Sequence, residues 1–163
     1  MGSLIFVTVS TGHFDPLIAA CDLLSSKFEF MGQIGMGYHE PKFPFVRQAT
    51  PLAIEEYMQK AELVISHGGT GMLSTLYKLR KPCIVVPKQV RYGEANDSQV
   101  ELAEKWAELG MAVLCMDVSN LEAAIGKCRN MTFKFPTFPS LGEHLSDALR
   151  LSLRLPVAGS LAR

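Results

Sequence analysis

Short apolar runs alternate along the chain with longer segments whose apolar residues recur at helical spacing. The first run, Leu4–Val9, is rich in branched residues, and residues 14–24 carry apolar side chains along one helix face. The same patterns predict further strands at residues 29–34, 43–48, 63–66, 83–86 and 112–116, and helices at 51–60, from the glycine cluster to about 79, at 98–109 and at 120–128. This alternation predicts an α/β fold in which helices cover both faces of a parallel sheet.

Local signals mark several of the helix ends. Thr50 can cap the helix that begins at Pro51, because proline is favoured at the first helical position. Ser98 and Glu101 have the spacing of a capping box. Gly110 is suited to end that helix in a left-handed conformation.

The last part of the chain has a different pattern. Residues 131–139 interleave phenylalanine with proline, which excludes a regular element there. Leucines then recur every four residues, at Leu141, Leu145, Leu149 and Leu153, which predicts an amphipathic helix. That helix either packs on its own sheet or forms a surface for another chain. We assign residues 1–130 to the α/β sheet and 131–163 to a loop and helix of the same domain.

Composition and charge exclude several classes of protein. With 163 residues, 48% of them hydrophobic and 20% charged, the chain suits one globular domain. Basic and acidic residues both number 16, so no positive excess supports nucleic-acid binding. No apolar run has the ~18–20 residues of a membrane span. The N-terminus lacks a basic region, which favours a first strand over a signal peptide.

The four cysteines, Cys21, Cys83, Cys115 and Cys128, lie far apart and form no CxxC pair. Three of them fall in apolar segments, so we expect buried, reduced thiols in a reducing compartment. Their spacing does not favour a zinc site.

The most informative candidate site is a glycine-rich turn between a predicted strand and a predicted helix. It contains His67, Gly68, Gly69, Thr70 and Gly71. Glycines allow close approach of a ligand, and the free N–H groups of a first helical turn can bind phosphate. The turn is neither a P-loop nor a GxGxxG motif, and a tight turn needed only for packing is the alternative. His67 can donate to a diphosphate or a sugar hydroxyl, or can serve only to fix the loop.

Two further loops follow predicted strands. Ser10, Thr11, Gly12 and His13 come after the first strand and offer hydroxyls and an imidazole. The polar stretch 87–99, which includes Asn96 and Gln99, follows the apolar strand at 83–86. No GxSxG motif and no clear Ser/His/Asp order is present, so the nucleophile-and-base patterns of catalytic triads are absent. The adjacent Glu55 and Glu56 suggest a solvated helix face instead of the carboxylate pair of a glycosidase.

Several of these segments together resemble a family of small glycosyltransferase subunits. The similar stretches are 7–11, 14–18, 33–35, 61–71, 81–87 and 96–103, and the resemblance spans roughly residues 4–115. The family is the C-terminal domain of family-28 glycosyltransferases occurring as a separate protein. It includes donor-binding subunits of two-subunit UDP-GlcNAc transferases of dolichol-linked oligosaccharide synthesis, and bacterial exopolysaccharide glycosyltransferase subunits.

The resemblance implies a Rossmann-like domain equivalent to the C-terminal half of a GT-B enzyme, which binds a UDP-sugar. The glycine turn at 67–71 and the loop at 10–12 match the segments that contact the diphosphate and sugar, and Asn96 and Gln99 match a loop that reaches the donor sugar. The family's transfer inverts the anomeric centre and requires no cofactor or bound metal. Helix dipoles and N–H groups stabilise the leaving UDP.

The resemblance also implies a second, membrane-attached subunit that binds a lipid-linked sugar diphosphate and carries the catalytic base. His13 is the local candidate for that base, and His67 is the other candidate catalytic residue. The chain is then expected to be cytoplasmic and peripheral at the membrane through this partner.

Three positions depart from the family pattern. Ser10 replaces a usual glycine, Ser98 a usual histidine, and Thr75 an acidic residue suited to binding ribose hydroxyls. A threonine cannot make the charge-assisted hydrogen bonds of a carboxylate. The departures at Thr75 and Ser98 make a non-catalytic nucleotide-sugar-binding or enhancer module an alternative. Another Rossmann-like enzyme, such as a nucleotide-sugar epimerase, is a third possibility.

Overall fold

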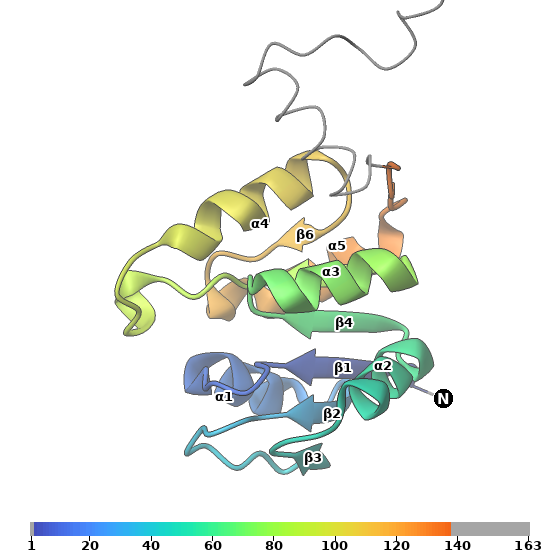
Figure 1. The fold of residues 1–163 in the computed structure, drawn as a ribbon. Helices are drawn as coiled ribbons and strands as arrows, with labels where there is room; N and C mark the ends of the chain where they lie inside the picture. The colour runs from blue at the N-terminus through green and yellow to red at the C-terminus, as the bar shows by residue number, and fades with distance from the viewer. Residues whose placement is uncertain (1, 138–163) are drawn as a thin grey trace, which may run out of the picture.

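The fold is a six-stranded, wholly parallel sheet, seen in a computed structural model that describes residues 2–137. The strand order is β3-β2-β1-β4-β5-β6 (Figure 1). The strands are β1 (Leu4–Thr8), β2 (Glu29–Gln33), β3 (Phe45–Val46), β4 (Leu63–Ser66), β5 (Cys83–Val85) and β6 (Val113–Leu114). All are parallel because each consecutive pair is joined by a crossover segment.

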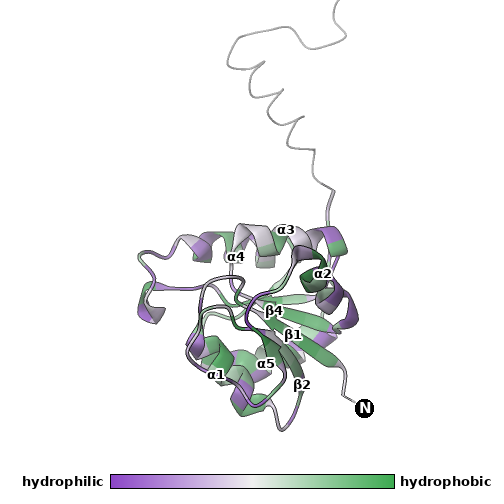
Figure 2. Cartoon of the chain, turned by 60° about the horizontal axis from the view of Figure 1, so that its bottom comes forward, coloured by the Kyte–Doolittle hydropathy of each residue, from purple (hydrophilic) through white to green (hydrophobic). Residues whose placement is uncertain are grey.

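Five α-helices are described in residues 2–137, and they cover both faces of the sheet. They are α1 (Asp15–Leu24), α2 (Pro51–Lys60), α3 (Thr70–Leu79), α4 (Ser98–Glu108) and α5 (Leu121–Asn130), with short 3₁₀ turns at Val90–Tyr92 and Val118–Asn120. One core contains buried residues of α1 and α5, and the other contains those of α2, α3 and α4. Figure 2 shows α3 and α4 on one side of the strands and α1 and α5 on the other. The predicted α/β architecture is confirmed.

The central strands are buried on both faces, which explains their continuous apolar sequences. In β4, Ile65 packs in the core under α1 and α5, while Val64 packs in the core under α2, α3 and α4. Ile65 is paired with Val7 of β1 and Ile84 of β5. Such a strand cannot show alternation of apolar and polar residues, because neither face meets water.

The helix ends agree with most of the sequence signals. Thr50 caps α2 by accepting a hydrogen bond from the Ala53 amide at 3.2 Å. Gly110 follows α4 with a φ of 79°. The predicted capping box of Ser98 is wrong, because Ser98 is already the first residue of α4 and its amide donates to Asn96 Oδ1 at 3.0 Å.

The irregular segment 131–137 crosses the edge of the sheet beside β6. Phe133 packs against the core under α1 and α5. The Lys134 amide donates to the Gly110 carbonyl at 2.9 Å, and the Tyr77 hydroxyl donates to the Pro136 carbonyl at 2.6 Å. No regular element forms over these residues, as predicted. Phe138, Pro139 and the helix predicted from Leu141 to Leu153 lie outside the described residues.

All four cysteines are buried free thiols, as expected. Burial raises the pKa of the Cys115 thiol to about 11 and that of Cys128 to about 12. Within residues 2–137, no group of three or more His, Cys, Asp or Glu side chains is arranged to hold a metal ion. None of the described helices combines the length and apolar character that crossing a membrane requires.

Candidate functional site

The candidate site lies where β1 and β4 run side by side at the centre of the sheet. The chain leaves β1 toward β2 on one side and leaves β4 toward β5 on the other. Loops diverge at such a switch point, and ligands of open α/β sheets bind there, beyond the carboxyl ends of the strands. The strand arrows in Figure 1 point to this edge, where the loop at 86–97 projects. The three predicted loops therefore meet at one edge of the sheet.

His67 follows β4 directly and is 9% exposed. Neither of its ring nitrogens has a hydrogen-bond partner among the described residues. Burial lowers the pKa of His67, and the positive charge of Lys88 lowers it further. The polar side chain of Gln99 and the negative charge of Glu94 raise this pKa, but by less. The imidazole is therefore neutral at pH 7 and retains one N–H donor and one acceptor for a ligand.

The N-terminus of α3 opens at the same place. The helix begins at Thr70, and Gly69, its N-cap residue, makes no side-chain hydrogen bond to the first turn. Thr70 and Gly71 are exposed, and a Cβ at Gly71 would meet nothing within 4 Å. The free N–H groups and the positive end of the helix dipole make this terminus suitable for an anion.

Gly68 and Gln99 join the glycine turn to the loop after β5. A Cβ at Gly68 would lie 3.1 Å from the Gln99 Cβ and 3.2 Å from its carbonyl oxygen. The Gln99 side-chain oxygen accepts a hydrogen bond from the Lys88 amide at 3.2 Å. The structure thus brings Gln99 to the glycine turn and directs its side-chain oxygen to the backbone amide of Lys88, while its role toward a donor sugar stays a prediction.

Lys88 is a functional candidate that sequence reasoning missed. Its side chain is only 12% exposed, and its Nζ lies 3.5 Å from Glu94 Oε1. A Cβ at Gly12 would stand 3.4 Å from the same Nζ, so the ammonium lies against the loop after β1. The sequence signal that could have identified Lys88 was its position shortly after an apolar strand, at the carboxyl end where ligands bind in parallel sheets. The site therefore contains a partly buried cation.

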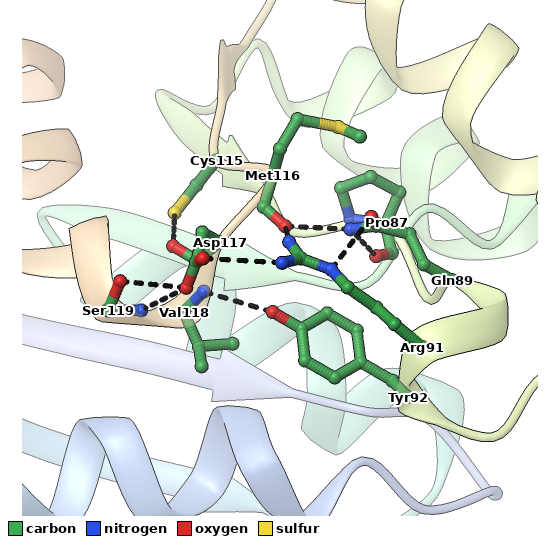
Figure 3. Close-up of polar contacts among 9 residues, drawn as sticks. All are labelled: Pro87, Gln89, Arg91, Tyr92, Cys115, Met116, Asp117, Val118 and Ser119. Atoms are coloured by element: carbon green, nitrogen blue, oxygen red, sulfur yellow. Dashed lines mark hydrogen bonds and ion pairs between the residues drawn. The ribbon is translucent and has the colours of Figure 1, made fainter.

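A polar network fixes the loop that carries Lys88 (Figure 3). The Arg91 guanidinium donates to Gln89 Oε1 at 3.1 Å, to Asp117 Oδ2 at 3.2 Å and to the Met116 carbonyl. The Gln89 side-chain amide donates to the same Met116 carbonyl at 2.7 Å. The Tyr92 hydroxyl accepts a hydrogen bond from the backbone amide of Val118 at 3.2 Å. These contacts fasten the loop to the segment after β6.

The loop after β1 is held by a chain of hydrogen bonds. Ser10 adopts a left-handed conformation with a φ of 57°, and its amide donates to Thr8 Oγ1 at 3.1 Å. The Thr8 hydroxyl in turn donates to Gln33 Oε1 at 2.7 Å. On the other side, the Gly12 carbonyl accepts from the Met36 amide at 2.8 Å. This φ is unfavourable for residues with a side chain, so Ser10 holds a strained conformation that a glycine would adopt freely.

A pocket of about 190 Å³ opens between this loop, α2 and α3. It is lined by Ser10, Thr11, Gln33, Ala49, Pro51, Ile54, Glu55, Met72 and Thr75. The Thr75 hydroxyl donates to the Gly71 carbonyl at 3.1 Å. Glu56 is exposed, as the predicted solvated helix face requires, while Glu55 is partly exposed and lines this pocket. The helical register of α2 separates the two adjacent carboxylates.

Two predicted site residues are not drawn into these contacts. His13 is exposed and makes no hydrogen bond or ion pair with a described residue. Asn96 is also exposed, and its side-chain oxygen accepts from the first amide of α4. Their roles toward a ligand stay predictions.

Comparison with known proteins places the chain among glycosyltransferase domains. A family model described as the glycosyltransferase family 28 C-terminal domain matches residues 5–137. The human protein named UDP-N-acetylglucosamine transferase subunit ALG13 is 32% identical over 149 residues, which covers 77% of this chain and 13% of that protein. The mouse protein of the same name is 34% identical over 126 residues, 68% of this chain and 10% of its own length. The chain thus spans a small part of these relatives.

Solved structures share the fold at low sequence identity. MurG of Acinetobacter baumannii superposes with a TM-score of 0.65 at 14% identity, over 93% of this chain and 50% of that chain. An NMR structure of ALG13 superposes with a TM-score of 0.55 at 20% identity, over 92% of this chain and 94% of that chain. The described fold is therefore the Rossmann-like fold found in one half of a GT-B glycosyltransferase.

Proposed function

Because the chain belongs to the family of glycosyltransferase family 28 C-terminal domains, we propose that it is the donor-binding subunit of an inverting glycosyltransferase that uses a UDP-sugar. UDP-GlcNAc or a related UDP-hexose is the expected donor. The names of the human and mouse relatives, which are UDP-N-acetylglucosamine transferase subunits, support this choice. Polysaccharide or glycolipid biosynthesis is the corresponding role.

The observation that carries the proposal is the unpartnered, buried imidazole of His67 beside an uncapped helix N-terminus. A buried polar group without a partner is costly, and a ligand that supplies the partner recovers that cost. The first turn of α3 attracts an anion, and the Lys88 ammonium, which is paired with Glu94 at 3.5 Å, lies at the same edge. A nucleoside diphosphate satisfies all three features.

The neighbouring pocket takes the nucleoside. Its volume of about 190 Å³ is smaller than the roughly 300–1,000 Å³ sites that enclose a drug-sized ligand, so it suits one part of a nucleotide sugar. Ala49, Pro51, Ile54 and Met72 offer apolar contact to a base, and Ser10 and Thr11 connect the pocket to the loop beside Lys88. The nucleoside and diphosphate subsites are thus contiguous.

Transfer proceeds by attack of an acceptor hydroxyl on the anomeric carbon, with UDP as the leaving group. Negative charge grows on the diphosphate as the bond breaks, and the dipole of α3, the Lys88 ammonium and the His67 N–H stabilise it. The acceptor hydroxyl must lose a proton to a base. We assign that base to the partner subunit, with His13 as the candidate in this chain.

The proposed partner is a membrane-attached subunit that binds a lipid-linked sugar diphosphate. A GT-B enzyme closes its site between two domains, and the described fold corresponds to one of them. The relatives' names describe a subunit, which supports a heteromeric enzyme. The chain is then peripheral at the cytoplasmic face of the membrane through that partner.

Calorimetric titration with UDP and UDP-GlcNAc tests the donor site. We expect saturable binding that His67→Ala weakens on the order of tenfold, since one hydrogen bond to a charged group contributes about 1.5 kcal/mol. His39→Ala, which changes a histidine in the segment between β2 and β3 that pairs with Asp22 of α1, is the control. Millimolar or weaker binding of every nucleotide, with and without a partner, contradicts the proposal.

A non-catalytic nucleotide-sugar-binding module is the second candidate. It is favoured by the hydrogen bond that Gln99 Oε1 accepts from the Lys88 amide, because this oxygen is then less available to a donor sugar. If this chain reconstituted with its partner subunit transfers sugar to an acceptor, and His67→Ala abolishes that transfer without unfolding the chain, the protein is an enzyme subunit. Donor binding without any transfer decides for the module.

A further inference from the structure

Glu55 is the single charged residue among those that line the 190 Å³ pocket. Its side chain is 29% exposed, and its Oε1 lies 3.1 Å from Lys78 Nζ. Thr75 lines the same pocket from α3, which runs beside α2 (Figure 1). We propose that Glu55 binds the ribose hydroxyls of the nucleotide and selects ribonucleotides over deoxyribonucleotides. This inference rests on the proposed function.

The hydrogen-bonding chemistry of the pocket supports a diol as the group beside Glu55. Each ribose hydroxyl carries one hydrogen and needs an acceptor for it, and an ionised carboxylate is an acceptor only. The Thr75 hydroxyl already donates its hydrogen to the Gly71 carbonyl, so its oxygen is left as an acceptor. The pocket thus offers acceptors from two helices to a ligand group that brings two donors.

Lys78 prepares the carboxylate for this role. Its Nζ pairs with one carboxylate oxygen, and no described residue donates a hydrogen bond to the other. The Lys78 side chain is 68% exposed, so the ion pair orients Glu55 without consuming its second oxygen, and contributes little energy of its own. A hydrogen bond from a ribose hydroxyl to that oxygen is charge-assisted and strong.

The location of Glu55 fits the direction of a bound nucleotide. Ser10 and Thr11 line the pocket and belong to the loop whose Gly12 lies against Lys88. The diphosphate between Lys88 and α3 therefore places the adjoining ribose at the pocket mouth, with the base among the apolar side chains. Thr75 lines the same pocket from α3, so a ribose there faces a carboxylate from α2 and a hydroxyl oxygen from α3.

Affinities of the full chain for UDP and 2′-deoxy-UDP, measured by calorimetry, test this assignment. Glu55→Gln removes the charge while keeping the shape. Glu56→Gln, on the same helix but exposed and outside the pocket, is the matched control. Lys78→Gln removes the ion pair and keeps the carboxylate.

We expect wild-type protein to prefer UDP over 2′-deoxy-UDP by on the order of tenfold. Glu55→Gln should abolish this preference by weakening UDP binding alone, while Glu56→Gln leaves it intact and Lys78→Gln lowers it less than twofold. Equal losses for both nucleotides, or an unchanged preference in Glu55→Gln, would overturn the inference and leave the donor site standing. Failure of the wild-type chain to bind either nucleotide would overturn the proposed function as well.

Discussion

The imidazole ring of His67 occupies the space into which a side chain at Gly69 would project. A Cβ added at Gly69 would stand 2.5 Å from His67 Cε1 and 3.2 Å from each ring nitrogen. The glycine is therefore required for the position of the histidine, since its own φ of −70° is open to any residue. Glycine here makes room for a neighbouring side chain.

Gly69→Ala should displace the imidazole and weaken UDP binding on the order of tenfold, with a stability loss of about 1 kcal/mol. Gly126→Ala, on α5 and away from the site, is the matched control, because a Cβ there meets nothing and alanine favours the helix by roughly 0.5–1 kcal/mol. Calorimetry and urea denaturation of both variants measure these effects. Equal affinities of the two variants for UDP would contradict this role of Gly69.

Lys88→Met should weaken UDP binding on the order of tenfold and leave uridine binding nearly unchanged, because only the diphosphate meets the ammonium. Lys105→Met, an exposed change on α4, serves as the control. Titrations with uridine, UMP and UDP give the dependence on phosphate number. A uniform loss across the three ligands would indicate a general structural role for Lys88.

The stability of the protein should fall as the pH decreases below about 6.5, the ordinary pKa of histidine. Burial lowers the pKa of His67 in the folded state, so the unfolded chain binds its proton at a higher pH than the folded one. Stability from the neutral imidazole is thus present above that pH and lost below it. Urea denaturation of wild type and His67→Gln between about pH 5 and about pH 8 measures this, and the variant should show the shallower decline.

Ser10→Gly should stabilise the chain by about 0.5–1 kcal/mol, since relief of the left-handed strain of about 1–2 kcal/mol exceeds the added entropy of the unfolded glycine. Ser10→Ala keeps the strain and should give no gain. Thermal denaturation compares the two variants with wild type. Stabilisation by both variants would contradict the assignment of strain to the φ of 57°.

Arg91→Lys should loosen the loop at 86–97 although it preserves the charge. A lysine cannot reproduce the planar guanidinium that bonds Gln89, Asp117 and Met116 together. Hydrogen exchange of the amides of Lys88 and Val90 should accelerate in the variant, and UDP binding should weaken with it. Unchanged exchange would show that the loop is held by its other contacts.

Much of the fold is local in origin, and the sequence alone determined it. The apolar strand at 63–66 and the helix that begins at Pro51 were predicted with their observed bounds, because side-chain periodicity and the Thr50 cap act over a few residues. The glycine turn, the buried thiols and the irregular segment after α5 were predicted for the same reason. The capping box predicted from Ser98 and Glu101 does not form. Ser98 is already the first residue of α4, and its amide donates to the Asn96 side chain.

The composition of the site was decided only by the tertiary structure. Lys88 and Gly12 are far apart in the sequence and meet because the strand order 3-2-1-4-5-6 brings the ends of β1 and β5 to one edge. Glu55 and Glu56 are indistinguishable neighbours in the sequence, yet the packing of α2 against α3 and β1 turns one toward a pocket and the other to solvent. Periodicity reports which face of an element is buried, whereas the partners of each polar side chain depend on how distant elements pack.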